Sequence, residues 1–498
     1  MTTFDLKKRA KTVVQNFMAN FGDFSSISAN YLGIEAGEYV ERICRILAEQ
    51  EWIYNFQLTR FFLERVWEKV PEEWRQPLLS LSTRNLNLLP SGHLKDDWPK
   101  SLKAFVETAA SLSLPWQQPP DLVAMEINKD LARGMTPKKK HEVSYLASVV
   151  RDTCGKTSCS SVIDVGSGLG YLGQVLHHQC GLQVVGVEAQ ASHVHGAQRR
   201  VKSQGEDKET QIQTMNLKLD DNPSSIRELE LLISSLQQSP SEGQSQSQNG
   251  DIHERDNGTC MVGLHCCGDL CPIMLKMFTS VERLRCLVCV SCCYHGMSVT
   301  DTDSRPSCFK NFPLSCTVQE KLKEVGRDFP DWQLNVFALR LAAQETRARW
   351  ACQSYEDHQF HTRSVAYRAI LEHVVSTAGK GIQKLKRKVT RKDAFQSFPV
   401  YLAAVFGRLT LHSDEVVQTE EDWKKYHDAL QQSHDQWEEY FPYIEVITAL
   451  QVLLQPVLET LVTVDRCLYL HEQGLKTEVV PIFDDSISPR NLVIIAER

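Results

Sequence analysis

The sequence predicts an α/β protein built on an open, mostly parallel sheet of seven strands, with a helical N-terminal domain and a helical insertion. Short apolar runs alternate with amphipathic helices from about residue 126. A glycine-rich turn follows the first of these runs, and two strands joined by a short turn end the chain. The 498 residues fit roughly two to three domains.

The first 125 residues are predicted to be helical. Arg42–Leu47 and Phe56–Leu63 place apolar residues three and four positions apart, as on the buried face of a helix. Three prolines between Leu114 and Pro120 then indicate a domain boundary. We therefore expect a helical domain over 1–125.

The strands and helices of the sheet follow in alternation. Strands are expected at Ser160–Val165, Leu182–Val187, Gln211–Leu217, Met261–Leu264 and Cys286–Val290, with helices at His141–Arg151 and Tyr171–Gln179. Residues 236–259 carry a polar run with no large apolar side chain and are predicted to be a disordered insertion.

The end of the chain supplies the strands that this sheet lacks. Thr477–Phe483 and Asn491–Ala496 are predicted strands, and an isolated hairpin would be marginally stable. We therefore expect a discontinuous sheet domain formed by 126–295 and 441–498. Residues 296–440 would be an inserted, mostly helical region.

Composition excludes little. A net charge of −7 gives no general attraction to nucleic acid, so any such contact needs a local basic patch, and nothing indicates DNA. The first residues show no pattern of a secretory signal or transit peptide, which predicts an intracellular protein, cytoplasmic or nuclear, with reduced cysteines. The apolar stretch Ile444–Val464 contains Glu445 and other polar residues, which favours a buried helix over a membrane span.

A candidate cofactor loop follows the first strand. Asp164 precedes a G-x-G-x-G turn with Gly166, Ser167, Gly168 and Gly170, and a helix follows. A dinucleotide site needs its third glycine one position later, where Tyr171 stands. An acid two residues before the first glycine suits S-adenosylmethionine instead, because a carboxylate can accept hydrogen bonds from the methionine ammonium.

Glu188 ends the next strand, about twenty residues after the loop, where a carboxylate can bind both ribose hydroxyls. Loop and acid together predict a class I, Rossmann-like methyltransferase sheet. The alternative is a tight turn in an α/β protein of another function. Asn216 is a candidate for adenine binding or a turn residue, and Lys139 and His141 are candidates for the methionine carboxylate or part of a solvated basic run.

Histidines and cysteines follow the fourth and fifth strands, as His265-Cys-Cys-Gly and Cys292-Cys-Tyr-His295. Ligands of open α/β sheets bind at these strand ends. In one interpretation His265 and His295 shape the acceptor site and one of them is a general base, with Cys293 as a further candidate catalytic residue. In a second, Cys289, Cys292, Cys293 and His295 bind zinc with Cys266 or Cys267, although no independent C-x-x-C completes a metal set. In the third, the cysteines are packing residues.

These motifs resemble the methyltransferase-like protein 25 family, and its B branch in particular. The resemblance rests on Met135–Val143, Asp164–Leu172, Gly263–Leu270, Cys292–His295 and Ser488–Leu492, and it covers most of the chain. It implies a class I methyltransferase whose substrate is poorly defined.

A more distant likeness covers two short segments. The His265 and Cys292 motifs are similar to motifs of a eukaryotic tRNA 2′-O-methyltransferase family, which implies RNA ribose methylation. Enzymes that methylate adenine amino groups carry an Asn/Asp-Pro-Pro/Ile-aromatic tetrapeptide where this chain has His265-Cys-Cys-Gly. That difference disfavours base amino-methylation.

RNA is the predicted acceptor, base or ribose. Lys380–Lys392 contains seven basic residues that could contact phosphates, or could be a solvated basic loop. The alternatives are a protein or small-molecule methyltransferase and a non-catalytic scaffold that retains cofactor binding.

Overall fold

The computed structural model describes residues 29–203, 212–238, 258–300, 307–344, 346–384, 391–406, 408–413, 416–417 and 425–498. The chain divides into two compact units, which are considered separately. The first unit comprises Met1–Ala48, Ser113–Gln344 and Leu458–Arg498, and the second comprises Glu49–Leu112 and Glu345–Val457.

The first unit contains the predicted seven-stranded sheet, in the order β3-β2-β1-β4-β5-β10-β9. Only β10 runs antiparallel to its neighbours. The strands are β1 (Cys159–Val165), β2 (Gln183–Glu188), β3 (Gln213–Asn216), β4 (Gly258–Cys267), β5 (Leu284–Cys292), β9 (Lys476–Pro481) and β10 (Leu492–Glu497). The fold class and the completion of the sheet by the C-terminal strands are confirmed. This order with one antiparallel strand is that of a class I methyltransferase sheet.

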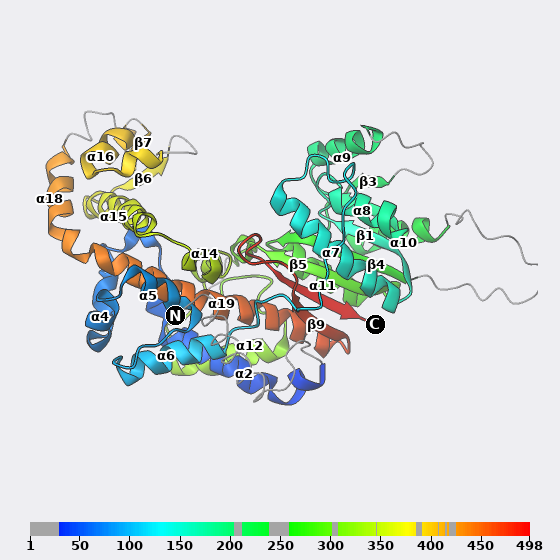
Figure 1. Ribbon diagram of the computed structural model, residues 1–498, viewed down its shortest axis with the longest axis horizontal. Coiled ribbons are helices and arrows are strands. Elements are labelled where there is room, and N and C mark those ends of the chain that lie inside the picture. Colours follow the sequence, from blue (N-terminus) through cyan, green and yellow to red (C-terminus); the bar gives the residue numbers. More distant parts are fainter. Residues whose placement is uncertain are drawn as a thin grey trace, which may run out of the picture. The chain divides into compact units, whose positions relative to one another are not determined.

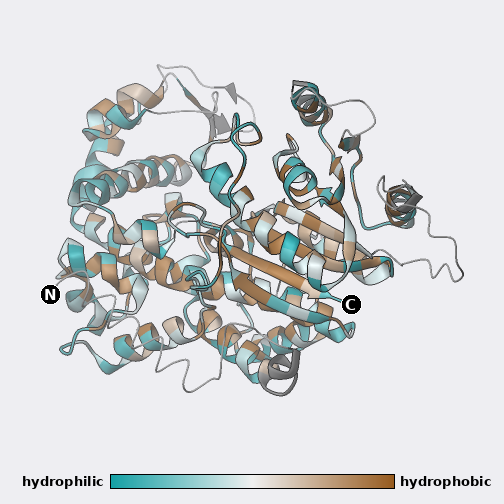
Figure 2. Cartoon of the chain, turned by 45° about the vertical axis from the view of Figure 1, so that its right-hand side comes forward, coloured by the Kyte–Doolittle hydropathy of each residue, from teal (hydrophilic) through white to brown (hydrophobic). Residues whose placement is uncertain are grey.

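The central strands are apolar on both faces, so the sheet is covered on both sides, as parallel sheets are. Val162, Val262 and Val288 belong to the core formed with α7 (Pro137–Lys156) and α8 (Tyr171–Cys180). Their neighbours Ile163, Met261 and Leu287 point the other way and are also buried. Figure 2 shows the central strands in brown, whereas many of the helices carry both brown and teal surfaces.

Helices α7 to α11 surround the sheet (Figure 1). Helix α7 starts where Pro137 occupies its first turn and the Thr136 side chain accepts a hydrogen bond from the Lys139 amide. Among the described residues, this unit also contains α2 (Ala29–Glu49), α9 (Ala191–Ser203), α10 (Pro223–Gln238), α11 (Leu270–Ser280), α12 (Cys316–Asp328) and α13 (Val336–Ala342).

The second unit is mainly helical. Its elements are α3 (Glu51–Tyr54), α4 (Glu72–Leu79), α5 (Thr83–Leu88), α6 (Lys100–Ser111), α14 (Arg347–Ala351), α15 (Tyr355–Thr377), α16 (Phe398–Phe406), α18 (His427–Trp437), and the small sheet β6 (Gly381–Lys384), β7 (Leu409–Ser413), β8 (Val416–Val417). Aromatic packing holds early and late segments together, since the Phe62 ring stacks on Trp437 at 5.7 Å between ring centroids.

The boundaries differ from those expected. Residues 1–125 do not form one domain, because α2 belongs to the first unit, where Arg45 pairs with Asp328 of α12. Residues 49–112 instead pack with 345–457, which was expected to be an insertion in the sheet domain. Of the predicted disordered insertion 236–259, residues 239–257 lie outside the described residues, and the rest belongs to α10 and β4.

Helix α19 (Phe441–Glu472) contains the apolar stretch considered above. The continuous helical segment His427–Glu472 is long and apolar enough to span a membrane by composition, but 94% of its apolar window is buried within the protein. Its apolar side chains are thus already covered, as expected for a core helix.

Candidate functional site

The glycine loop connects β1 to α8. Gly166, Gly168 and Gly170 have φ angles of +70°, +57° and +73°, which side chains other than glycine rarely adopt. The amides of Gly166 and Ser167 both donate to the carbonyl of Val187 on β2, at 2.8 and 3.2 Å. The loop is therefore held against the end of the neighbouring strand.

Glu188 ends β2 and faces this loop. Its Oε2 accepts a hydrogen bond from the Gly168 amide and its Oε1 one from the Gln190 amide, both at 2.9 Å. Each oxygen keeps a lone pair beyond these contacts. The carboxylate is thus fixed in orientation, mostly buried, and still able to accept from a ligand.

A pocket of about 650 Å³ opens at the carboxyl ends of β1, β2 and β4. Gly166, Glu188 and Cys267 line it, together with the segment Leu217–Asn222 after β3. This is where parallel α/β sheets bind ligands, and the volume is typical of a cofactor site.

Two polar atoms of the loop lie buried with no hydrogen-bond partner among the described residues. They are Oδ2 of Asp164 and Oγ of Ser167. Burial, opposed by the charge of Lys139 and assisted by that of nearby Glu188, raises the pKa of Asp164 to about 7. Unsatisfied buried groups are costly, so their presence beside a pocket fits a loop that is completed by a ligand.

Asn216 does not reach toward a ligand in this structure. Its side-chain amide donates to the backbone carbonyls of Glu188 and Ala189, at 3.1 and 3.0 Å, and so joins the ends of β3 and β2. The pocket is lined instead by Asp220, Asp221 and Asn222, which precede α10. Sequence reasoning missed them, although three adjacent polar residues between a strand and a Pro-initiated helix were a usable signal.

His265 lies just beyond the regular part of β4, with a left-handed φ of +64°. Its Nε2–H donates to Oε1 of Glu142 at 2.9 Å, and its side chain is 27% exposed. A neutral ring that donates from Nε2 keeps its lone pair on Nδ1, the nitrogen that can accept a proton. Non-glycine residues with such strained backbones cluster at functional sites.

Glu142 was not singled out from the sequence. It lies on α7, its side chain is 1% exposed, and it also accepts from Ser488 Oγ at 2.8 Å and pairs with Lys139 Nζ at 3.2 Å. Burial alone would raise the pKa of Glu142, but the hydrogen bond from His265, together with Lys139 and Ser488, lowers it to about 2. Glu142 is therefore an ionised, buried carboxylate that orients His265.

Lys139 and His141 thus have partners within the protein. Lys139 pairs with Glu142, and Nε2 of His141 accepts from the Asp484 amide at 3.0 Å, in the turn between β9 and β10. Burial lowers the pKa of His141, which suits its role as an acceptor. The same turn carries Ser488, so the C-terminal hairpin contributes to the wall around Glu142.

Cys293 and His295 follow β5. Cys293 has a left-handed φ of +46°, and Tyr294–Gly296 forms the short helix η4. Nδ1 of His295 is buried without a hydrogen-bond partner among the described residues, and burial, with the charge of Arg340, lowers the pKa of this histidine.

The basic segment Lys380–Lys392 belongs to the second unit, and its residues 385–390 lie outside the described ones. Lys392 Nζ lies 4.9 Å from the centre of the Phe360 ring, and Lys380 Nζ lies 5.8 Å from that of Tyr426. Lys380 and Lys392, at the two ends of the segment, therefore each lie over an aromatic ring.

Comparison with known proteins agrees with this geometry. Residues 138–300 match a family described as a methyltransferase domain. The chain is 23% identical to human probable methyltransferase-like protein 25, over 92% of this chain and 96% of that protein. It is 29% identical to the mouse protein of the same name, over 50% of this chain and 39% of that protein. These matches do not distinguish a B branch. The matched segment spans the glycine loop, Glu188 and both Cys-His motifs, and we conclude that the chain carries a methyltransferase domain and is an enzyme of the methyltransferase class.

Proposed function

We propose that this chain transfers a methyl group from S-adenosylmethionine to a hydroxyl group of RNA. The observation that carries the proposal is the glycine-loop pocket with Glu188 in its wall, beside a histidine oriented by a buried carboxylate. The methyltransferase class follows from the matches above, whereas the cofactor and the acceptor are proposals.

The residues of the pocket fit S-adenosylmethionine. Glu188 would bind the ribose hydroxyls, and Asp220 or Asp221 would accept from the adenine amino group. Gly166, Ser167, Gly168 and Gly170 would bring the backbone close to the methionine part, with Asp164 behind them. The bound cofactor supplies an electrophilic methyl group on a sulfonium. The protein's own contribution is to orient both reactants and to exclude water.

The acceptor side favours a hydroxyl. A hydroxyl is a weak nucleophile until a base removes its proton, and Nδ1 of His265 can take that proton. Glu142 holds the ring through Nε2 and stabilises the imidazolium that forms, as a carboxylate does behind a catalytic histidine. His265 lies near the pocket, since it stands two residues before the pocket-lining Cys267 on β4.

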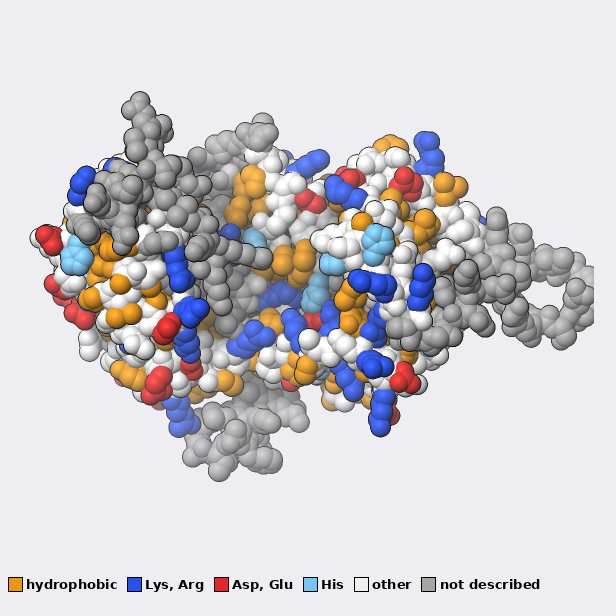
Figure 3. Space-filling view, turned by 90° about the horizontal axis from the view of Figure 1, so that it is seen from above, with side chains coloured by type: hydrophobic (Ala, Val, Ile, Leu, Met, Phe, Trp, Pro, Cys, Tyr) orange, Lys and Arg blue, Asp and Glu red, His pale blue; other side chains and the backbone are white. Residues whose placement is uncertain are grey.

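Basic side chains near the pocket support an RNA acceptor. Lys218 and Lys310 line it, and Lys138 and Lys140 are exposed at the start of α7. Figure 3 displays Lys and Arg side chains gathered near His side chains on the right-hand part of the face, which belongs to the first unit. The segment Lys380–Lys392 and the likeness to tRNA 2′-O-methyltransferase motifs support the same acceptor. Phosphate contacts of this kind give affinity without reading sequence.

Cofactor binding is tested by thermal unfolding with S-adenosylhomocysteine. A ligand at about 100 times its Kd stabilises by roughly 2.7 kcal/mol, which raises Tm by several degrees. Glu188→Gln should lose the shift, because both carboxylate oxygens accept from amides and an NH₂ group would face one of them. Glu478→Gln, a half-buried acid on β9, is the matched control. No shift and no heat of binding would refute cofactor use and favour a scaffold.

The acceptor is tested separately with labelled S-adenosylmethionine and total cellular RNA. Methylated product digested to nucleosides should contain 2′-O-methyl ribose, which protects the adjacent phosphodiester from alkali. Label recovered on bases would contradict the hydroxyl proposal, and label recovered only on protein would contradict RNA as the acceptor.

A further inference from the structure

Three cysteines converge at the carboxyl ends of β4 and β5. The Sγ atoms of Cys267, Cys292 and Cys293 all lie within 4.8 Å of one another. Cys267 and Cys292 are register partners on the two strands, with 3.0 Å between their sulfurs. Two buried sulfur pairs are wider, with 3.6 Å between Cys289 and Cys271 and 3.7 Å between Cys159 and Cys286.

The backbone departs from regular strand geometry to achieve this convergence. Successive side chains of a strand point to opposite faces, so Cys292 and Cys293 would normally diverge. The left-handed φ of +46° at Cys293 ends the alternation and brings both thiols together. On β4 the pairing register shifts between Leu264 and Cys266, one residue before Cys267. Irregularities of this kind redirect side chains next to active sites.

These cysteines also differ from the packing cysteines of the same strands. Cys266 contacts Met274 and Cys289 contacts Cys271, all of them buried in the core beside α11. Cys267 is exposed and lines the pocket. Packing explains a buried thiol, but it gives no reason for an exposed thiol to meet two others at a pocket wall.

A second triplet, Cys154, Cys260 and Cys286, has similar sulfur distances but is entirely buried. Cys260 and Cys286 are both 0% exposed, and they lie among apolar side chains of the sheet core. Cys159 Sγ lies 3.7 Å from Cys286 Sγ beside this triplet, and none of the three thiols is exposed at a pocket. The buried triplet serves as the internal comparison.

We propose that Cys267, Cys292 and Cys293 bind one zinc ion, with a fourth position open to the pocket. Tetrahedral Zn–S bonds of about 2.3 Å separate the sulfurs by roughly 3.8 Å, so modest side-chain rotation closes the site. Binding replaces three thiol protons by one Zn²⁺, and the protons leave to water. Three protein ligands with an open position are the arrangement of reactive rather than purely structural zinc sites.

The fourth position takes water or an oxygen or sulfur atom of the acceptor. Zinc would thereby orient that atom at the pocket wall to which Glu188 and the glycine loop also contribute. The metal site itself does not depend on the proposed cofactor or acceptor, and it can be tested without either of them.

The full chain is reduced under nitrogen, stripped of metal and titrated with Co²⁺, whose thiolate charge-transfer and tetrahedral d–d absorption bands report three-sulfur ligation. Zinc content is measured by mass spectrometry of the elements. We expect about one metal ion per wild-type chain and loss of the bands in Cys267→Ser and Cys293→Ser. Cys260→Ser and the exposed Cys316→Ser should retain the bands. Cys267→His should restore metal binding with an altered spectrum.

Three results would overturn the proposal. The first is a fully reduced wild-type chain that takes up no metal, in which case a Cys267–Cys292 disulfide found before reduction would assign the pair to redox chemistry. The second is unchanged absorption in Cys267→Ser. The third is loss of absorption in Cys260→Ser with a native circular dichroism spectrum, which would assign the metal to the buried triplet.

Discussion

Each unit contains a buried glutamate bound to a histidine, yet the two pairs differ in what surrounds them. In the first unit, Glu142 binds one nitrogen of His265, whose side chain is 27% exposed. In the second unit, Glu445 binds Nδ1 of His358, whose side chain is 4% exposed. Nε2 of His358 is also engaged, by Oδ1 of Asn87 at 2.6 Å.

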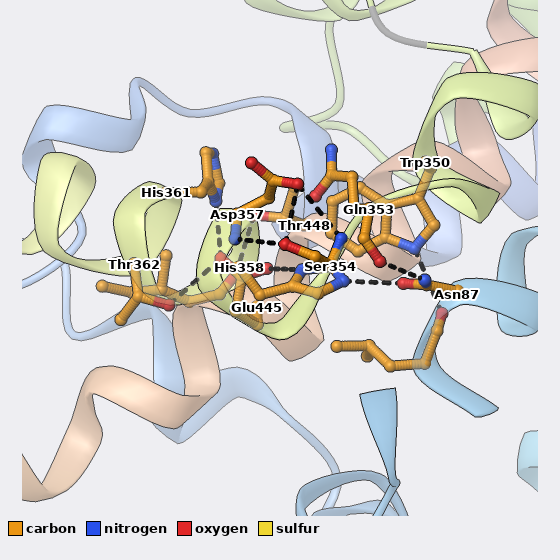
Figure 4. Close-up of polar contacts among 12 residues, drawn as sticks. Asn87, Trp350, Gln353, Ser354, Asp357, His358, His361, Thr362, Glu445 and Thr448 are labelled. Carbon is orange, nitrogen blue, oxygen red and sulfur yellow. Dashed lines mark hydrogen bonds and ion pairs between the residues drawn. The ribbon is translucent and has the colours of Figure 1, made fainter. Parts of the chain in front are cut away.

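Figure 4 shows the polar contacts around the second pair. His361 and Thr362 also contact Glu445, and Asn87 donates onward to the carbonyl of Gln353 at 2.7 Å. Asn87 therefore presents its oxygen to His358, and both ring nitrogens face acceptors. Neither ring nitrogen of His358 is therefore available to a ligand, whereas Nδ1 of His265 has no hydrogen bond among the described residues. The same two residue types thus build a cross-link in one unit and a candidate base in the other.

The largest expected effect comes from removing the available nitrogen. His265→Gln keeps the size of the side chain and a donor for Glu142 but cannot accept a proton. We expect kcat for methyl transfer to fall by about 10²- to 10⁴-fold, with Tm little changed. His195→Gln, on the exposed part of α9, is the control. A kcat within about threefold of wild type would exclude His265 as the base.

Breaking the enclosed pair should affect stability instead. Glu445→Ala leaves a buried histidine without its carboxylate, which costs about 3–5 kcal/mol. Faster amide hydrogen exchange in α15 would report this loss of stability at the site itself. Glu356→Ala, at an exposed position of the same helix, is the control. Exchange unchanged in Glu445→Ala would mean that the network is dispensable.

The same pair predicts an acid dependence. Burial opposes ionisation of Glu445, but hydrogen bonds from His358 and His361 lower its pKa below the usual 4.5. The stability it contributes is therefore present above about pH 4.5 and is lost as the pH falls through the folded pKa. Glu445→Ala should reduce the acid sensitivity of α15.

Glu142→Gln should give a smaller catalytic loss than His265→Gln. It removes the charge that orients His265 without removing the base, so we expect kcat to fall by about 10²-fold. Glu142→Asp should restore part of the rate, while the Kd for S-adenosylhomocysteine stays unchanged. An equal loss of cofactor affinity would instead assign Glu142 to cofactor binding.

Asp164 is a third buried carboxylate, and unlike Glu142 and Glu445 it has no histidine partner among the described residues. Burial raises the pKa of Asp164 to about 7, whereas the pKa in the unfolded chain is 3.8. The stability that this difference contributes is therefore fully present below pH 3.8 and is lost as the pH rises through about 7. Asp164→Asn should therefore be more stable than wild type at pH 8, by about 1–3 kcal/mol. Denaturant midpoints at pH 5 and pH 8 test this, and a variant less stable at pH 8 would contradict it.

The sequence predicted the sheet well because its strands are local patterns. Apolar runs ending at Val165 and Glu188, and the glycines between them, carry enough information by themselves to indicate the loop and the ribose acid. The C-terminal hairpin was assigned to the sheet because an isolated hairpin would be unstable, and β10 does pair with β5.

What escaped prediction depends on contacts between distant residues. Glu142 meets His265 and Ser488 only after the chain has folded, and Asn87 meets His358 across much of the sequence. The helical boundaries were missed for the same reason, since an amphipathic pattern shows that a helix is buried but not against which partner. Cys267 could be separated from Cys266 only once the register shift on β4 was visible.

Because β10 pairs with β5, one edge of β5 stays uncovered during synthesis until the end of the chain has been made. β5 ends at Cys292 and its partner begins at Leu492, so the ribosome must make the intervening chain before that edge of β5 is covered. At about 5–20 residues per second this takes roughly 10–40 s. Throughout that interval a strand with Leu287, Val288 and Val290 presents an open edge, to which a chaperone or a second nascent chain can bind.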